Sequence, residues 1–286
     1  MFVSSPTSGW CLHATGLVCS CGTVKHRFLF PLPPSERGAP IGQAPLVRFF
    51  RRVRSYNWLV EISSYGETCL RFKAREGVVV ADAYPSVVGP TGRGLTADIA
   101  TYSRPDGHPT LGLEKETRRS ARKADGGRLP ASLQSAFVLD SPGEYEVHEV
   151  LITGVRTFGD DAQGADRGLN TSFVFELDGL HALHLGDIGH LLSEDMLGEV
   201  GNVDVACVCV GGSLSPARAA ELVAQLDAKL VVPMPLDSNA AGTEPLGRFL
   251  HEMGVQHSEP VAKLSVSISS LPQETTVVLL EPRARG

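Results

Sequence analysis

Three histidines and one aspartate lie close together in the segment GLHALHLGDIGH, residues 179–190. They are His181, His184, Asp187 and His190. Neutral imidazoles and carboxylates are ligands that Zn²⁺ binds in proteins, and bound zinc lowers the pKa of a water molecule that then attacks a substrate. The segment therefore indicates either a metal site or a β-strand that ends in polar residues.

The period of a strand weakens the first interpretation. Side chains alternate between the two faces of a strand, so His184 shares a face with Ala182 while His181 lies on the other face. A histidine at such a position in a strand is more often a buried, hydrogen-bonded residue than a metal ligand. Asp187 follows Gly186 in a turn, where a carboxylate can bind backbone N–H groups instead of a metal.

The elements that must position these residues predict an α/β protein. The run 203–212 is continuously apolar, which is typical of a strand covered on both faces. Ser215 and Pro216 are suited to the start of a helix. The expected strands are 58–63, 68–73, 77–82, 96–102, 136–140, 145–155, 171–179, 181–187, 203–212, 229–234, 264–270 and 275–281, and the expected helices are 193–201, 215–228 and 242–254.

Most of these strands precede the first long helix, and a βαβα section follows them. This order favours two packed sheets with helices outside, a four-layer αββα sandwich, although other α/β layouts have the same order. We expect the domain at residues 57–286, with a polar insertion near 104–134, a length that is unusual for a loop in a compact domain. Residues 1–56 are rich in Pro, Ser, Gly and Arg and predict a disordered or irregular N-terminal extension.

Charge and composition exclude several classes of protein. A net charge of −6 gives no reason to expect a nucleic acid partner. No apolar run reaches the roughly 18 residues of a membrane span. No Lys or Arg precedes the apolar stretch 10–21 as a secretory signal requires, which leaves a signal or lipid anchor as the lesser alternative. The six cysteines form no C-x-x-C motif, so a cysteine zinc site is not expected, and their pattern suits a cytoplasmic protein.

The stretch GVRTFGDDAQGADRGLNTSFVFELDGLHALHLGDIGH, residues 154–190, resembles the metallo-β-lactamase superfamily. The similarity is to its small bacterial zinc-dependent hydrolases, which are related to sugar-lactone hydrolases. Other matching segments are ISSYGETCLRF (62–72), SPGEYEV (141–147), VDVACVCVGG (203–212) and VVPM (231–234). The resemblance implies the metallo-β-lactamase fold, an αββα sandwich with two zinc ions at its edge. Its ligands would be an H-x-H-x-D-H loop after a strand, a later His, an Asp in a Gly-Asp turn and a last His.

The H-x-H-x-D-H loop is altered in this chain. It should follow TADIATYS, where the sequence continues RPDGHP. In the simplest register Arg104 takes the place of the first His and Asp106 that of the second. His108 then takes the place of the Asp, and Pro109 that of the final His. Arg104 is a poor ligand because its guanidinium is permanently charged.

The other ligand positions are mostly lost as well. The residue after GVRTF is Gly159 and the residue after VVPM is Pro235, whereas Asp187 keeps its place. The two-zinc site of the family therefore cannot be assembled. Catalytic zinc usually takes three protein ligands, and Asp106, His108 and Asp187 supply three if the fold brings them together.

Four further residues are candidates for the surroundings of the site. Asp82 stands where the family places an aspartate beside the metals, although a turn at the strand end explains it equally well. Glu67 replaces a histidine of the family's GH dipeptide, and His190 follows the Gly-Asp turn. Together with Arg104, these residues are the expected pocket.

Two hypotheses follow from this pattern. The first is a non-catalytic or weakly active relative of a metal-dependent hydrolase that binds a small molecule or a protein partner. The alternative is a mononuclear hydrolase of an ester, lactone or phosphoester that uses zinc or manganese. The lost histidines favour the first hypothesis, with no bound cofactor, and they leave the oligomeric state open.

Overall fold

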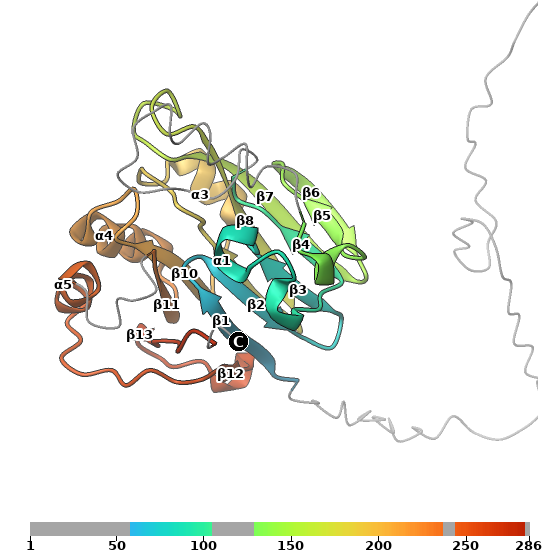
Figure 1. The fold of residues 1–286 in the computed structure, drawn as a ribbon. Coiled ribbons are helices and arrows are strands. Elements are labelled where there is room, and N and C mark those ends of the chain that lie inside the picture. Colours follow the sequence, from blue (N-terminus) through green and yellow to red (C-terminus); the bar gives the residue numbers. More distant parts are fainter. Residues whose placement is uncertain (1–57, 105–128, 237–243, 284–286) are drawn as a thin grey trace, which may run out of the picture. The chain divides into compact units, whose positions relative to one another are not determined.

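Two β-sheets pack face to face in the computed structural model of the chain (Figure 1). The structure describes residues 58–104, 129–236 and 244–283. The expected N-terminal extension and most of the polar insertion lie outside these residues, and so do Asp106 and His108.

The first sheet has the strand order β12-β1-β2-β3-β4-β5. Its strands β12, β1, β2 and β3 pair antiparallel, whereas β3, β4 and β5 pair parallel. The parallel part matters for the site, because β3 and β4 end at the same edge of the sheet. The bounds are β1 Val60–Gly66, β2 Cys69–Lys73, β3 Val78–Ala81, β4 Ile99–Thr101, β5 Phe137–Leu139 and β12 Leu264–Val266.

The second sheet has the strand order β13-β11-β10-β9-β8-β7-β6. Strands β9, β10, β11 and β13 are parallel, and β6 to β9 form an antiparallel meander. The bounds are β6 Gly143–Val147, β7 Val150–Phe158, β8 Leu169–Leu177, β9 Leu180–His184, β10 Val205–Val210, β11 Leu230–Pro235 and β13 Thr276–Val277.

The space between the sheets is filled by apolar side chains from both of them. Phe72 of β2 and Phe175 of β8 meet there with ring centroids 5.1 Å apart. Burial of such large apolar surfaces is the main favourable term in folding, so this layer holds the two sheets together.

Helices cover the outer faces of both sheets, which confirms the four-layer αββα sandwich (Figure 1). α3, α4 and α5 pack on the second sheet, and α1 packs on the first with the short 3₁₀ helices η1 and η2. The bounds are α1 Pro85–Val88, η1 Gly92–Gly94, η2 Ala131–Leu133, α3 Glu194–Val200, α4 Pro216–Leu226, α5 Glu244–Glu252 and η3 Ile268–Ser270. None of the helices described here is long and apolar enough to cross a membrane.

Two predictions of single strands were wrong. The run 145–155 is a hairpin of β6 and β7, because His148 (φ 52°) and Glu149 (φ 67°) turn the chain in the left-handed region. The alternating run 264–270 remains a strand only to Val266 and then forms η3, where Ser267 and Ser270 cap each other's backbone. Local side-chain hydrogen bonds thus outweigh the strand pattern there.

Candidate functional site

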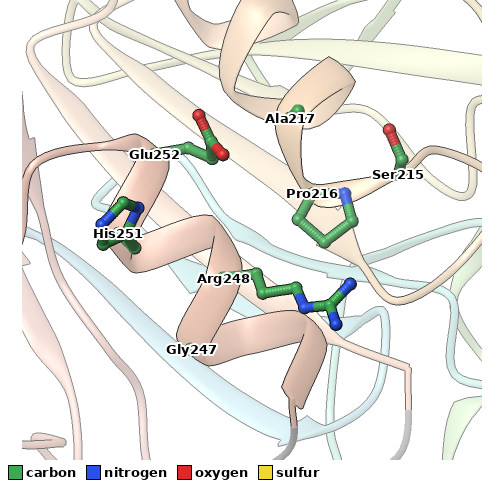
Figure 2. Close-up of a pocket in the computed structure, with 7 residues that line it drawn as sticks. All are labelled: Ser215, Pro216, Ala217, Gly247, Arg248, His251 and Glu252. Atoms are coloured by element: carbon green, nitrogen blue, oxygen red, sulfur yellow. The ribbon is translucent and has the colours of Figure 1, made fainter.

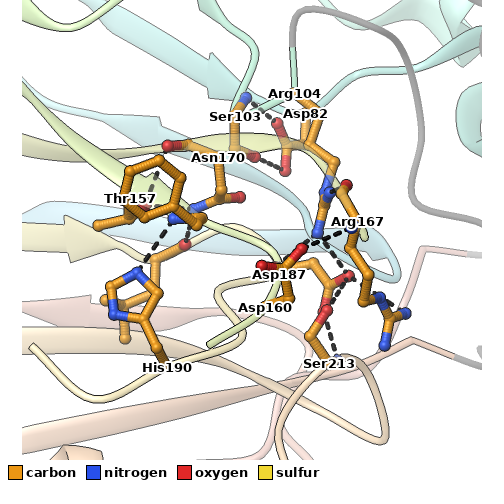
Figure 3. A network of polar contacts seen from close by, with 12 residues as sticks. Asp82, Ser103, Arg104, Thr157, Asp160, Arg167, Asn170, Asp187, His190 and Ser213 are labelled. Carbon is orange, nitrogen blue, oxygen red and sulfur yellow. Dashed lines mark hydrogen bonds and ion pairs between the residues drawn. The ribbon is translucent and has the colours of Figure 1, made fainter. Parts of the chain in front are cut away.

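The candidate site lies where the carboxyl ends of several parallel strands meet. Arg104 follows β4, Asp187 follows β9 and Ser213 follows β10. In α/β folds the loops after parallel strands gather at one edge, which is where ligands and catalytic groups are usually found. Residues 159–168, the loop between β7 and β8, border the same place (Figure 3).

Arg104 and Asp187 form a buried ion pair (Figure 3). The Nη2 group of Arg104 donates to the Asp187 carbonyl oxygen at 2.8 Å and lies 3.0 Å from Oδ2 of the carboxylate. Its Nη1 group donates to the carbonyl oxygen of Arg167 at 2.6 Å. The side chains of Arg104 and Asp187 are only 3% and 0% exposed, so water screens their attraction weakly.

Further donors satisfy the Asp187 carboxylate. The backbone N–H of Ser213 donates to Oδ1 at 2.6 Å, and the Ser213 hydroxyl donates to Oδ2 at 2.8 Å. The Arg167 guanidinium lies 4.0 Å from Oδ2. Both carboxylate oxygens therefore accept hydrogen bonds from protein donors, and a metal ion at Asp187 would have to compete with them.

The absence of a side chain at Gly159 makes room for Arg104. A Cβ atom at this position would lie 2.7 Å from Nη1 and 2.9 Å from Cζ of Arg104, closer than real Cβ contacts come. The guanidinium is held by three hydrogen bonds and cannot move aside without breaking them. The place predicted for a metal-binding histidine is thus filled by the side chain of Arg104.

Asp160 fixes the loop that follows Gly159. Its carboxylate accepts hydrogen bonds from the backbone N–H groups of Ala162, Gly164, Asp166 and Arg167. Burial alone would raise the pKa of Asp160, but these hydrogen bonds outweigh it and hold the pKa below its usual value. The fixed loop presents the Arg167 carbonyl oxygen to the guanidinium of Arg104.

Asp82 acts on the site through its neighbour Ser103. Asp82 is buried in the left-handed region (φ 53°), and it accepts hydrogen bonds from the Ser103 backbone N–H at 2.7 Å and from the Ser103 hydroxyl. The phenolic oxygen of Tyr84 accepts the next backbone N–H, that of Arg104, at 3.0 Å. These contacts fix the backbone from which the Arg104 side chain leaves β4.

The other two predicted pocket residues have local roles. His190 accepts the backbone N–H of Phe158 at Nε2 (3.0 Å), so its Nδ1 donates to the Leu191 carbonyl oxygen (2.7 Å). It thereby holds the strand end just before Gly159. Glu67 lies in the β1–β2 turn with φ 51°, which follows Gly66 at φ 106°.

The remaining histidines of the 179–190 segment do not converge on Asp187. His184 is buried, and its Nε2 lies 2.8 Å from the Thr68 carbonyl oxygen. His181, on the opposite face of β9, lies 3.5 Å from a carboxylate oxygen of Asp204. Both arrangements agree with the strand interpretation of the segment.

The sequence profile of the β-lactamase superfamily domain matches residues 61–235 of this chain. The chain belongs to the metallo-β-lactamase superfamily. A Thermotoga maritima structure, assigned to the Zn-dependent hydrolases of this superfamily, is similar at 27% identity and a TM-score of 0.54, over 77% of this chain and 98% of that chain. A Parabacteroides distasonis structure, assigned as a metal-dependent hydrolase, has 15% identity and a TM-score of 0.48, over 78% and 93%. No curated protein matches the chain.

The residues that the structure describes do not fit the two zinc ions that the metallo-β-lactamase superfamily implies. Within residues 58–104, 129–236 and 244–283, no three His, Cys, Asp or Glu side chains are grouped so that they could hold a metal ion. Pro235 ends β11 and offers no ligating atom. Asp187 instead binds Arg104 and Ser213, while Asp106 and His108 lie outside the described residues.

Several residues of this superfamily member's site were missed by the sequence analysis. Ser213 and Arg167 bind at Asp187, and Asn170 donates to Thr157 (2.7 Å) and to the Leu185 carbonyl oxygen (2.8 Å) beneath it. One signal was present for Ser213, which comes directly after the strand-and-glycine run 203–212. A polar residue in that position after a parallel strand is a candidate for the site.

A separate pocket is lined by Ser215, which comes two residues after Ser213 in the chain (Figure 2). It has a volume of about 370 Å³ and lies between the first turn of α4 and one face of α5. Gly247, on that face of α5, has open space where a Cβ would be. The lining residues are Ser215, Pro216, Ala217, Gly247, Arg248, His251 and Glu252, a mixture of cationic, anionic and hydroxyl groups.

Proposed function

We propose that the chain is a non-catalytic member of the metallo-β-lactamase superfamily that acts by binding a small molecule or a protein partner. The observation that carries this proposal is the buried contact of Arg104 with Asp187. It places a permanent positive charge on the one carboxylate that keeps a ligand position of the family.

The proposal has a chemical reason. Bound zinc would supply a Lewis acid and a water molecule of lowered pKa, and it needs an open coordination position to do so. The Arg104 guanidinium neutralises Asp187 but coordinates no water in this way. We therefore expect no activated hydroxide at this site and no hydrolysis of esters, lactones or phosphoesters.

The alternative, a mononuclear metal-dependent hydrolase, has one observation in its favour. The Thermotoga maritima relative, at 27% identity, is assigned to the Zn-dependent hydrolases. In that case Asp106, His108 and Asp187 would hold zinc or manganese. The carboxylate of Asp187 would first have to exchange Arg104 for the ion.

Metal analysis of the full-length protein separates the two functions. The purified protein is incubated with excess Zn²⁺ or Mn²⁺, desalted, and examined by native mass spectrometry and elemental analysis. Turnover of nitrophenyl acetate, a simple lactone and bis-nitrophenyl phosphate is measured on the same samples. We expect neither bound metal nor turnover above that of a heat-treated sample. Stoichiometric metal with turnover, both abolished in Asp187→Ala, would establish the hydrolase instead.

If the protein acts by binding, the pocket between α4 and α5 is our candidate for a small polar ligand. His251 and Glu252 line this pocket beside Arg248, which is ion-paired with Glu244, and this mixed lining favours a polar molecule. A thermal-shift screen of amino acids and their phosphorylated forms tests this, with His251→Ala as the pocket variant. Hits that persist unchanged in His251→Ala would place the ligand elsewhere.

A further inference from the structure

We infer that this chain carries its own cation. The region around Asp187 is a cation site, and the side chain of Arg104 fills it permanently in place of a metal ion. This inference rests on the proposed function and adds to it the reason why no metal ion enters the site. The contacts that carry it can be tested by stability measurements, without an assay of enzymatic activity.

The buried carboxylate of Asp187 needs a compensating charge. Its side chain is 0% exposed, and an uncompensated carboxylate in such a place is strongly destabilising. Arg104 supplies the compensating charge at 3.0 Å. Removal of one partner from a buried ion pair leaves the other charge buried and unpaired. We therefore expect Asp187 to depend on a neighbouring cation for stability, whether or not the protein is an enzyme.

The Arg104 cation also provides a cross-link. Arg104 lies in the segment after β4. It binds the 159–168 loop through the carbonyl oxygen of Arg167 and the segment after β9 through Asp187. Asp187 continues the connection to the end of β10 through Ser213. One guanidinium thus ties together loops from both sheets, which is what a metal with ligands on those loops would do.

The Arg104 guanidinium also excludes a larger side chain from position 159. The Arg104 guanidinium and a β-carbon at position 159 cannot occupy the same space. The two Nη groups make the contacts to Asp187 and Arg167, whereas Nε has no hydrogen-bond partner among the described residues. The contacts of Arg104 are therefore made by the terminal part of its side chain, so we expect a free guanidinium ion to be able to form the same contacts.

A double-mutant cycle tests the coupling of the pair. Arg104→Met and Asp187→Asn are each expected to lower the folding equilibrium constant by about 100- to 1000-fold, since each leaves one buried charge alone. The double variant is expected to be at least about tenfold more stable than the sum of the two losses predicts. Urea unfolding followed by fluorescence and circular dichroism measures all four proteins. Additive losses would show that the two side chains act independently and overturn the inference.

Chemical rescue tests the cation site directly. Arg104→Ala is melted in low-millimolar guanidinium chloride, with the same concentrations of sodium chloride and urea as controls. We expect guanidinium alone to raise its melting temperature, and no such rise in the wild type, in Arg104→Ala/Asp187→Asn or in the exposed-site control Arg156→Ala. An equal response in the variant that lacks Asp187 would mean that guanidinium binds elsewhere, which contradicts the inference.

Arg104→Lys covers the case in which Arg104→Ala does not fold. Lysine keeps the charge but lacks the forked donors, so we expect a stability between those of the wild type and Arg104→Met. A stability of Arg104→Lys equal to that of Arg104→Met would show that the charge is unimportant. The two proposals fail separately: turnover by the wild type contradicts the proposed function, whereas additivity in the cycle contradicts only the internal cation.

Discussion

Arg104, which the resemblance aligns with a histidine ligand of the family, has a side chain that never loses its charge. Two neighbouring residues accommodate this buried charge. Gly159 leaves space for the guanidinium, and Asp187 balances its charge. Arg104 therefore depends on Gly159 for space and on Asp187 for a balancing charge.

Gly159→Ala tests this dependence. Its added methyl group would overlap the held guanidinium, so we expect a loss of about 1–3 kcal/mol in the free energy of unfolding. Urea denaturation measures the loss. Gly198→Ala is the control, because its Cβ in the exposed helix α3 meets nothing within 4 Å. That variant is expected to be more stable by about 0.5–1 kcal/mol. Similar effects at the two glycines would contradict the crowding at position 159.

The single residues of the site were only partly predictable. The interpretation of Asp187 as a turn residue that binds a backbone N–H group agrees with its contact to Ser213, whereas its role as a family metal ligand stays a prediction. That Asp187 and Arg104 bind each other was not predictable, because 83 residues separate them in the chain and the sequence carries no sign of a contact so distant. Nor did anything in the spacing reveal that Arg104 fills the volume beside Gly159.

At the scale of elements, the 159–168 loop is a rigid support because of one carboxylate. The pKa of Asp160 is lowered in the folded protein, so its stabilising effect is complete above the ordinary carboxyl pKa of 3.8 and is lost as the pH falls through the lower folded value. Asp160→Asn is expected to flatten the acid limb of stability against pH. Unfolding free energies between neutral pH and about pH 2.5 measure this. Parallel curves for the two proteins would exclude the role given to Asp160.

Helix α4 begins next to the site, and its first turn depends on Ser215. The Ser215 hydroxyl accepts the backbone N–H of Arg218. Ser215→Ala is expected to destabilise the protein by about 1 kcal/mol, whereas Ser215→Asp keeps the cap. Thermal unfolding of both variants tests the difference. An alanine variant as stable as the aspartate variant would show that the cap contributes nothing.

Elements with regular patterns were predicted well, and those defined by backbone conformation were not. Helix α4 was recognised from Ser215 and Pro216, and β10 from its continuous apolar run. The turn of the β6–β7 hairpin was missed because His148 and Glu149 adopt positive φ without the Gly or Asn that usually marks such turns.

At the scale of the whole molecule, apolar layers on both faces of each sheet make the sandwich one folding unit within the described residues. This arrangement followed from the order of strands and helices, which is a property of the pattern and does not depend on the site. The fold therefore does not depend on the identity of the residues at the site, and membership of the family does not by itself establish hydrolysis.

The reactivity of the buried cysteines can be used to test this packing. Cys69, Cys207 and Cys209 are buried, and burial raises the pKa of each thiol. Because the thiolate is the reactive form, we expect none of the three to react with iodoacetamide in the native protein near pH 8, and all three to react in denaturant. Peptide mass mapping distinguishes the sites. Rapid alkylation of Cys209 in the native state would show that the layer beneath Asp187 opens easily.

The close approach of Arg104 to Gly159 also limits how a metal ligand could be engineered into this site. A histidine at position 159 and the Arg104 guanidinium would occupy the same volume, so the histidine cannot be introduced while Arg104 is present. Removal of Arg104 alone would leave the buried Asp187 carboxylate without its ion-pair partner. Positions 104 and 159 therefore have to be changed together in any such design.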